Sequence, residues 1–377
     1  MGMNLTVNVG GLRDLVLRAA SIAGSRAGRG VNYESVMLRA GEEGVLSVSA
    51  TDGELSYFGS CPAEVVVGGS ILVSASMLSG ILRAFKGKDM TLEGLEGPPA
   101  LKLRSKGFKA ELVGSNEGGI PECPALEGVS WAKVEAKAWS VVLANTMVSM
   151  KKDDARYTLN GLCLERGETP GVWRCLSTNA MILSMFDFQV EEGPDFIFPT
   201  HQVLLPPKGL LEMSRMVAEV EEPLEFCFVG DKMVMKVVNR CLVMSLMHGR
   251  FPDYKLIVGE DVGEKLELSR DLLIEGLRMA DILSRGNKED QKMRLELLPD
   301  GLSLESIGMY GGTRGFVEGT WEGGTLELMI KPDILLKSLE PLAGERICLK
   351  FKTTDKTLTI TAPEQVGYKG VMTTFTK

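Results

Sequence analysis

The 377-residue sequence has few of the residues from which catalytic and metal sites are usually built. It contains two histidines, His201 and His248, and its seven cysteines include no Cys-x-x-Cys pair. Zinc motifs need closely spaced ligands, and an odd number of cysteines does not fit a disulfide framework, so both are disfavoured and a reducing cytoplasm is favoured. None of the patterns GxxxxGK[ST], GxGxxG and GxSxG occurs, which argues against a nucleotide-binding loop and a serine-hydrolase turn. We therefore expect no catalytic residues, no metal and no cofactor.

Long apolar runs and an excess of positive charge are also missing. No run approaches the ~18–20 apolar residues of a membrane-spanning helix. Forty-two Lys and Arg against 50 Asp and Glu give a net charge of -8, so bulk positive charge cannot hold nucleic acid. Hydrophobic residues make up 44% and charged residues 24%, as in a folded globular protein, and the length allows two to four domains.

What the sequence does contain is a repeat. Apolar residues at helical spacing recur three times, about 130 residues apart. The three sets are Leu12, Leu15, Val16 and Ala19; Trp139, Leu143, Met147 and Met150; and Leu273, Leu277 and Ala280. A strand-like run follows each set, at 34–39, 159–165 and 293–298, and a second such run follows at 45–50, 172–177 and 302–306.

Each repeat also predicts a second helix, at 76–85, 209–218 and 333–339, with further strands after it. Turn-rich stretches at 114–124 and 251–263 separate the repeats. The pattern predicts an α+β fold with helices on one side of antiparallel sheets. We expect three domains at 1–126, 127–250 and 264–377, with a linker at 251–263.

The charge is distributed unevenly between the expected helices and the remainder. Together the windows 10–30, 74–88, 133–156, 208–222, 270–288 and 331–346 carry a net charge of +7. The other 267 residues therefore carry -15. Helices lining a common surface would form a positive track on an acidic particle, suited to contacting DNA phosphates without reading bases. Ordinary solvated helix faces carry similar cations, so the charge pattern alone leaves both interpretations open.

Four short segments resemble the bacterial DNA polymerase III beta subunit, the sliding clamp. They are 156–161 (RYTLNG), 249–254 (GRFPDY), Thr51-Asp52-Gly53 and Gly370-Val371-Met372. The resemblance extends over the whole chain, and the order of these segments fits the three repeats.

The resemblance implies a head-to-tail homodimer whose six similar domains close into a ring around double-stranded DNA, with the helices lining the hole. It implies a non-enzymatic processivity factor that binds DNA independently of sequence. Its partners would be a DNA polymerase and an ATP-driven clamp loader, which bind through short peptide motifs. Residues that match DNA-facing positions of the family are Arg26, Arg29, Arg104, Lys106, Lys151, Lys152, Tyr157 and Lys208. Phe108, Ile282 and Leu283 match positions of the dimer interface, although an apolar core would also explain them.

The resemblance further implies an apolar groove that receives partner peptides, formed by Leu159, Thr178, Leu183, Pro252, Ile257, Val371 and Met372. This region departs from the family. The usual Thr-Asp-Gly-His-Arg-Leu is TNAMIL at 178–183, Leu256 stands where Arg is common, and Met372-Thr373-Thr374 replaces Met-Pro-Met. These changes remove charged donors that orient a peptide and make the groove more apolar. We expect a divergent clamp with its own partner motif.

Two alternatives remain open from the sequence. The altered groove and the modest positive charge of the second and third repeats fit a clamp-like peptide-binding scaffold that does not encircle DNA. A carboxylate-dependent hydrolase is the other alternative, and Asp153 and Asp154 would be its candidate residues. Lys151 and Lys152 precede that pair, so a solvated charged loop explains it better.

Overall fold

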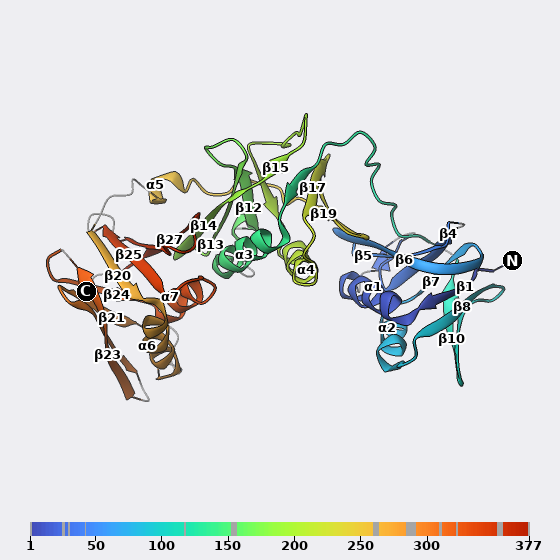
Figure 1. Ribbon diagram of the computed structural model, residues 1–377, viewed down its shortest axis with the longest axis horizontal. Helices are drawn as coiled ribbons and strands as arrows, with labels where there is room; N and C mark the ends of the chain where they lie inside the picture. The colour runs from blue at the N-terminus through green and yellow to red at the C-terminus, as the bar shows by residue number, and fades with distance from the viewer. Residues whose placement is uncertain are drawn as a thin grey trace. The chain divides into compact units, whose positions relative to one another are not determined.

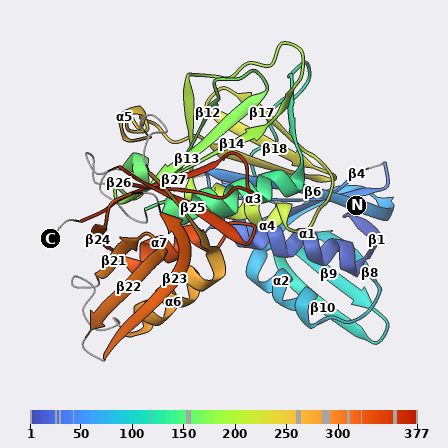
Figure 2. The same cartoon turned by 60° about the vertical axis from the view of Figure 1, so that its left-hand side comes forward.

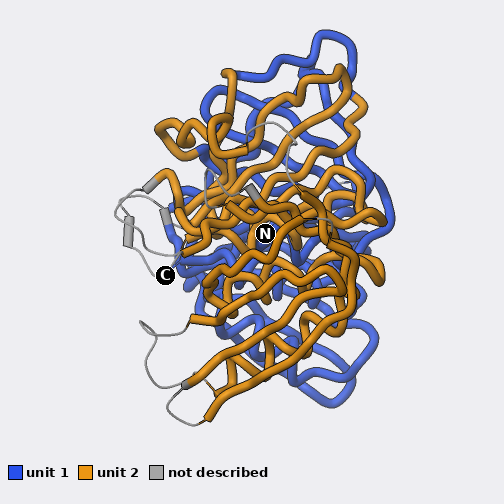
Figure 3. The backbone as a smooth tube through the Cα atoms, turned by 90° about the vertical axis from the view of Figure 1, so that its left-hand side faces the viewer, with its two compact units in different colours: residues 1–136, 192–199, 211–246 blue, residues 137–191, 200–210, 247–377 orange. Residues whose placement is uncertain are grey.

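The computed structural model describes two compact units (Figures 1 and 3). Unit 1 comprises 1–136, 192–199 and 211–246, and unit 2 comprises 137–191, 200–210 and 247–377. The residues that the structure describes are 2–24, 27–28, 31–41, 43–116, 118–151, 157–258, 264–283, 292–308, 311–321, 323–352 and 357–375.

Unit 1 is built on antiparallel strands in the order β1-β8-β9-β10-β7-β4-β5-β6-β19-β18-β17-β11-β15. The strands are β1 (Asn4–Asn8), β4 (Ser35–Gly41), β5 (Val45–Thr51), β6 (Leu55–Val67), β7 (Gly69–Ser74), β8 (Asp89–Glu96), β9 (Pro99–Ser105), β10 (Phe108–Ser115), β11 (Ala132–Val134), β15 (Glu191–Glu192), β17 (Leu224–Val229), β18 (Lys232–Val237) and β19 (Arg240–Ser245). A short separate ladder pairs β2 (Ala27–Gly28) with β3 (Val31–Asn32). Because β1 also pairs with β6, the strands of the first repeat form a closed circuit.

Helices α1 (Val9–Ile22) and α2 (Ala75–Ala84) pack on each other in unit 1 (Figure 1). The side chain of Asn8 caps α1 by accepting the N–H groups of Gly10 and Gly11 at 3.0 and 3.3 Å. The apolar residues of α1 recur every three or four positions, so one helix face is buried against β5 and β6. Helix α4 (Pro207–Val217) is divided between the two units, and its residues from Leu211 onward belong to unit 1.

The strands of unit 2 follow the order β16-β12-β13-β14-β27-β26-β25-β20-β23-β22-β21-β24. They are β12 (Leu162–Arg166), β13 (Val172–Thr178), β14 (Ile182–Gln189), β16 (Gln202–Leu205), β20 (Glu264–Ser269), β21 (Met293–Leu298), β22 (Gly301–Gly308), β23 (Gly311–Trp321), β24 (Leu326–Ile330), β25 (Arg346–Lys352), β26 (Thr357–Thr361) and β27 (Tyr368–Thr373). The pairing of β14 with β27 joins the second repeat to the third in one sheet.

Unit 2 also holds helices α3 (Ala136–Thr146), α5 (Lys255–Val258), α6 (Arg270–Leu283) and α7 (Pro332–Leu339), with 3-10 turns η1 (Met147–Ser149) and η2 (Tyr157–Leu159). Helix α6 packs on α7 and on β20, β22 and β23 (Figure 2). Trp139 of α3 lies 5.3 Å from the ring of Phe188, on the face of β14 opposite Leu183 and Met185. Strand β14 is therefore buried on both faces, which explains its nearly continuous apolar sequence.

The expected repeat of elements is confirmed. Helices α1, α3 and α6 each precede an antiparallel pair, namely β4–β5, β12–β13 and β21–β22. Helices α2, α4 and α7 follow as the second helices, so the fold is α+β with a repeated order of elements. Within the described part of the chain, no helix combines the length and the apolar character that crossing a membrane requires.

One tight turn of unit 1 bears on the site below. It joins β5 to β6 at Thr51-Asp52-Gly53. Asp52 Oδ1 accepts the N–H groups of Glu54 and Leu55 at 3.0 and 2.7 Å, and Thr51 Oγ1 accepts that of Gly53 at 3.1 Å. Gly53 has φ of +95°, a conformation that side-chain-bearing residues rarely adopt.

Candidate functional site

The predicted groove residues of the second and third repeats meet on neighbouring strands of unit 2. Leu183 of β14 is paired with Thr178 of β13 on one side and with Val371 of β27 on the other. Residues directly opposite in an antiparallel ladder point to the same face. The three side chains therefore form one row, while Met372, paired with Ile182, faces the other way and is 1% exposed.

The segment from Phe251 to Val258 covers the face that carries Leu183. Phe251 and Tyr254 are buried in one cluster with Leu183 and Met185. Pro252 is exposed, and the side chains of Leu256 and Ile257 are 84% and 51% exposed. The segment thus turns two residues inward as anchors and presents three apolar side chains to solvent, as a docking surface requires.

Leu159 belongs to a second segment at the same place. A Cβ on Gly161 would lie 2.5 Å from Sδ of Met247, and one on Gly249 would lie 2.6 Å from Cγ2 of Thr158. The chain around Leu159 therefore lies against the residues that precede Phe251, and both glycines are needed for this close approach. Leu159 itself is 2% exposed.

A polar network that the sequence analysis missed fixes Tyr254. The Tyr254 hydroxyl donates to the buried carboxylate of Glu165 and accepts from Arg174 Nη1 at 3.2 Å. Arg174 also donates to both carboxylate oxygens of Asp187 at 2.7 and 2.8 Å. Burial, together with the Glu165 contact, raises the pKa of Tyr254 to about 12, so the hydroxyl keeps its proton and remains a donor.

The sequence signal for this network is weak. Glu165, Arg174 and Asp187 stand opposite one another only because the register of β12, β13 and β14 brings them into one row. Nothing in their sequence spacing predicts that row. The row holds the Tyr254 hydroxyl on the sheet, at the residue that directly precedes α5.

The turn between β13 and β14 replaces the charged residues usual in the family. Asn179 Oδ1 accepts the N–H groups of Met181 and Ile182 at 2.9 and 3.0 Å, and Thr178 Oγ1 accepts that of Ala180 at 3.1 Å. Ala180 has φ of +71°. The turn thus keeps a conformation that normally calls for glycine, although no glycine is present.

The predicted DNA-facing residues lie in several elements. Arg104 of β9 is paired with Glu93 at 2.8 Å, Lys106 lies in the turn between β9 and β10, and Lys208 lies on α4. The backbone N–H of Lys151 donates to the Leu159 carbonyl at 3.2 Å. Of the remaining predicted residues, Tyr157 belongs to η2, and Arg26, Arg29 and Lys152 lie outside the described residues, as do Asp153 and Asp154.

Several helix cations of the charged windows are bonded within the protein. Arg13 donates to the carbonyls of Leu82 and Phe85 at the end of α2, and Arg270 donates to those of Leu339 and Glu340 at the end of α7. Other ion pairs of these windows include Arg18 with Glu212 and Glu219, Arg278 with Glu340, and Lys337 with Asp333. These contacts hold several of the cationic side chains of the helices against the protein itself.

Two strands present unpaired edges. In β10, Phe108 to Val113 pair with β9, and only Gly114 and Ser115 pair with β7. In β23, Gly311 to Glu318 pair with β22, and only Gly319 to Trp321 reach β20. Among the described residues, no other strand pairs with either outer edge. Unpaired edges of this kind are templates for a strand of another chain.

The two edges border cavities of opposite charge. A cavity of about 1090 Å³ beside β10 is lined by Phe108 and by five basic side chains against one acidic one. The basic residues are Lys86, Lys88, Arg104, Lys106 and Lys109. A cavity of about 1180 Å³ beside β23 is lined by Phe316 and by five acidic side chains against two basic ones. Phe108 is 72% exposed and Ile282 is 57% exposed, so neither is a core residue of the chain.

Comparison with solved structures defines the class of protein. The DNA polymerase sliding clamp from Bacillus subtilis matches with a TM-score of 0.91 and 17% identity, covering 100% of both chains. A beta sliding clamp of Caulobacter crescentus matches with a TM-score of 0.90 and 21% identity over 100% of this chain and 99% of that one. The fold is that of the DNA polymerase sliding clamps.

Sequence comparison finds relatives among the beta sliding clamps. The family profile described as DNA polymerase III beta subunit, central domain, matches residues 133–253. The beta sliding clamp of Vibrio cholerae is 26% identical over 81% of this chain and 82% of its own length. That of Caulobacter vibrioides is 24% identical over 90% and 91%. Residues 133–253 thus match the central domain of the DNA polymerase III beta subunit, and the longer matches to beta sliding clamps are at 24–26% identity.

Proposed function

We propose that this protein is a DNA sliding clamp, a processivity factor that encircles duplex DNA and tethers a polymerase. The observation that carries the proposal is the match of the whole chain, with all its repeats, to clamps of known structure. The clamp has no catalytic site of its own. Among the described residues, no group of three or more His, Cys, Asp or Glu side chains is arranged to hold a metal ion.

Retention on DNA tests this function directly. A closed ring held by topology stays on circular DNA and leaves linear DNA through its ends, because its phosphate contacts are weak. We expect long retention on a nicked circle after loading, and rapid loss once the circle is cut. Equal loss from both DNA forms would instead favour a peptide-binding scaffold that does not encircle DNA.

The ring requires a homodimer with head-to-tail contacts. The proposed domains are 1–126, 127–250 and 264–377, with 251–263 as linker. The unpaired edges of β10 and β23 and the opposite charges beside them support a contact between the first domain of one copy and the third of the other. Sedimentation is expected to give about 82 kDa, twice the chain mass of 40.9 kDa.

Charge introduced at Phe108 of β10 and at Ile282 of α6 tests that contact. Phe108→Asp and Ile282→Asp should each give monomers, because each places an unpaired carboxylate in an apolar contact. Val66→Asp is the matched control, since Val66 is 75% exposed on β6. Mixing the two disrupted chains should restore dimers with one intact contact. A Phe108→Asp chain that stays dimeric by itself would remove Phe108 from the interface.

The DNA track is proposed to comprise Arg26, Arg29, Arg104, Lys106, Lys151, Lys152, Tyr157 and Lys208. Joint replacement of Lys152, Tyr157 and Lys208 should shorten retention on circular DNA and reduce its dependence on salt. Lys232→Ala, an exposed cation on β18, is the control. Unchanged retention of the triple variant would count against this assignment.

Partner peptides of the polymerase and the clamp loader are proposed to bind beside Leu159, Thr178, Leu183, Pro252, Ile257, Val371 and Met372. Leu256 offers the sharpest test, because it is exposed and stands where the family commonly has Arg. Leu256→Arg should strengthen binding of peptides with a carboxylate near that position, while Ile257→Ala should weaken all peptides. Equal binding of standard clamp peptides by the unmodified chain and the Arg variant would argue against a distinct partner motif.

The free thiols of all seven cysteines agree with a cytoplasmic location, which we propose for this clamp.

A further inference from the structure

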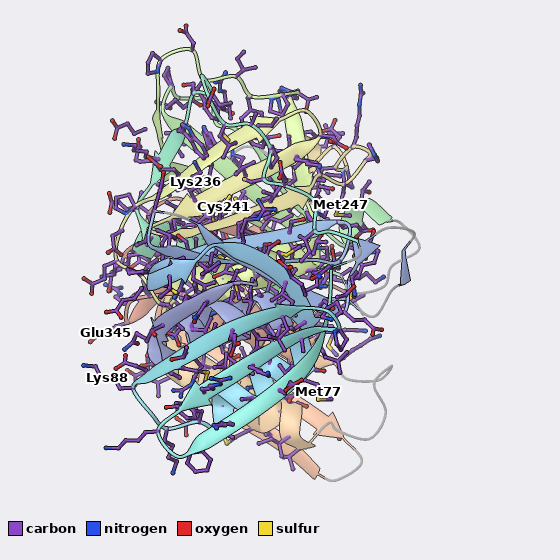
Figure 4. All side chains as sticks on the ribbon, turned by 90° about the vertical axis from the view of Figure 1, so that its right-hand side faces the viewer. Met77, Lys88, Lys236, Cys241, Met247 and Glu345 are labelled. Carbon is purple, nitrogen blue, oxygen red and sulfur yellow. The ribbon has the colours of Figure 1, made fainter. Side chains whose placement is uncertain are left out.

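The segment that connects β10 to β11 in unit 1 places two cysteines side by side. Cys123 lies in this segment, and its Sγ is 3.8 Å from Sγ of Cys241 on β19. Lys236 is directly opposite Cys241 on β18, and Figure 4 labels both residues on these neighbouring strands. The two sulfur atoms come from positions 118 residues apart, so the fold and not the local chain brings them together.

The connecting segment is held on the sheet on the C-terminal side of Cys123. Leu126, Val129 and Trp131 pack against the buried cluster that contains Cys241. The ammonium of Lys236 lies 4.6 Å from the centroid of the Trp131 ring. These contacts keep Cys123 near β19, while the absence of helix or strand at residues 120–127 leaves its backbone free of ladder hydrogen bonds.

Access to the sulfur atoms differs between the two cysteines. Both line a cavity of about 640 Å³ that also borders Phe58, Lys236 and Arg240. Cys123 is partly exposed, whereas Cys241 is 8% exposed. A small solute that enters the cavity therefore reaches Cys123 first.

The two thiols also differ in their pKa values, and this difference again favours reaction at Cys123. The thiols of Cys123 and Cys241 are in hydrogen-bond contact and Lys236 lies nearby, so the pKa of Cys123 is lowered to about 7 although burial opposes the shift. Cys241 retains its proton, because the contact with Cys123 and burial both raise its pKa. Burial raises the pKa of the thiols of Cys61, Cys163, Cys175, Cys227 and Cys348, which disfavours their reaction.

We propose that Cys123 and Cys241 are a redox-sensitive thiol pair that a hydroperoxide converts into a reversible disulfide. The Cys123 thiolate attacks one peroxide oxygen, the O–O bond breaks, and a sulfenic acid forms; the departing hydroxide takes up the proton that Cys123 released on ionisation and becomes water. Cys241 then attacks the Cys123 sulfur, the S–O bond breaks, and its proton leaves with the hydroxide as a second water. Two thiols and one hydrogen peroxide give one disulfide and two waters, and a dithiol reductant reverses the reaction.

The bond requires a modest movement. The sulfur atoms must approach from 3.8 Å to about 2.05 Å, which the connecting segment supplies more readily than β19. The product fastens the segment between β10 and β11 to the sheet. The proposal does not depend on whether the protein encircles DNA.

Peroxide titration of the full chain tests the pair. Of the seven thiols, we expect the unmodified chain to lose two, and a non-reducing digest to yield one peptide linked between Cys123 and Cys241. Cys241→Ser should instead accumulate a sulfenic acid at Cys123 that a dimedone probe traps. Cys227→Ser is the matched control and should form the disulfide normally.

The same titration can overturn the proposal. Retention of all seven thiols at peroxide levels that oxidise a free thiol peptide would refute it. A linked peptide containing Cys227 in place of Cys241 would refute the assignment of the partner. Loss of two thiols from Cys123→Ser would also refute it, because the first nucleophile is absent from that chain.

Discussion

The turn at 51–55 in unit 1 and the turn at 178–182 in unit 2 have the same hydrogen bonds and different residues. In each, a threonine hydroxyl accepts the N–H two residues later, and an Asx oxygen accepts the next two N–H groups. Unit 1 uses aspartate followed by glycine, and unit 2 uses asparagine followed by alanine. Threonine and the Asx side chain therefore suffice to fix the turn, and glycine only removes its conformational cost.

Removing the side-chain acceptor of Asp52 or Asn179 should have the largest effect on stability, and the size of the effect should differ between the two turns. Asp52→Ala is expected to cost about 2–3 kcal/mol of local stability and Asn179→Ala about 1–2 kcal/mol, because a charged acceptor forms stronger hydrogen bonds. Hydrogen exchange of peptides that span each turn measures both effects separately. Equal losses would show that the charge of Asp52 does not contribute.

Exchanging alanine and glycine at the position of positive φ should change stability less, and in opposite directions in the two turns. Ala180→Gly is expected to stabilise unit 2 by about 1 kcal/mol, because glycine adopts φ of +71° without strain. Gly53→Ala should destabilise unit 1 by about 1–2 kcal/mol, since its Cβ would also lie 3.2 Å from the Tyr33 hydroxyl. Urea denaturation with hydrogen exchange as the local readout distinguishes the two. Destabilisation by Ala180→Gly would mean that Ala180 makes a compensating contact.

Exchanging the two Asx residues should have the smallest effect. Asp52→Asn removes charge assistance from two hydrogen bonds and should cost about 0.5–1 kcal/mol. Asn179→Asp adds charge assistance to the corresponding hydrogen bonds and should stabilise the turn at 178–182 by about 0.5 kcal/mol at neutral pH. Exchange rates of the amides of Leu55 and Ile182 report each change. Shifts of the same sign in both variants would contradict the comparison.

Much of the repeated fold could be predicted from the sequence because its helices and hairpins carry strong periodic patterns. The spacing of Leu12, Leu15 and Val16 defines the buried face of α1. The helix at Trp139 was expected to reach Met150 but ends at Thr146. There Asn145 and Thr146 are buried and bond to the carbonyls four residues earlier, and η1 follows. Side-chain competition of this kind is invisible to apolar periodicity.

Other features depend on contacts between distant residues. The strand expected at 159–165 begins at Leu162, because 157–159 forms a 3-10 turn. Strand β14 has no alternation to detect, since both of its faces are buried. In the candidate groove, the apolar positions are a prediction from the family resemblance. The row from Glu165 to Asp187 that fixes Tyr254 follows from strand register alone.

The pairing of β14 with β27 also constrains how the chain reaches its native state. Ile182 and Met372 are about 190 residues apart in the sequence. The edge of β14 that pairs with β27 therefore has no partner until most of unit 2 has been synthesised. During that interval an apolar strand is available to wrong partners, including the same strand of another nascent chain. We therefore expect the yield of folded protein to depend more on the rate of synthesis and the supply of chaperones than on the stability of the native state.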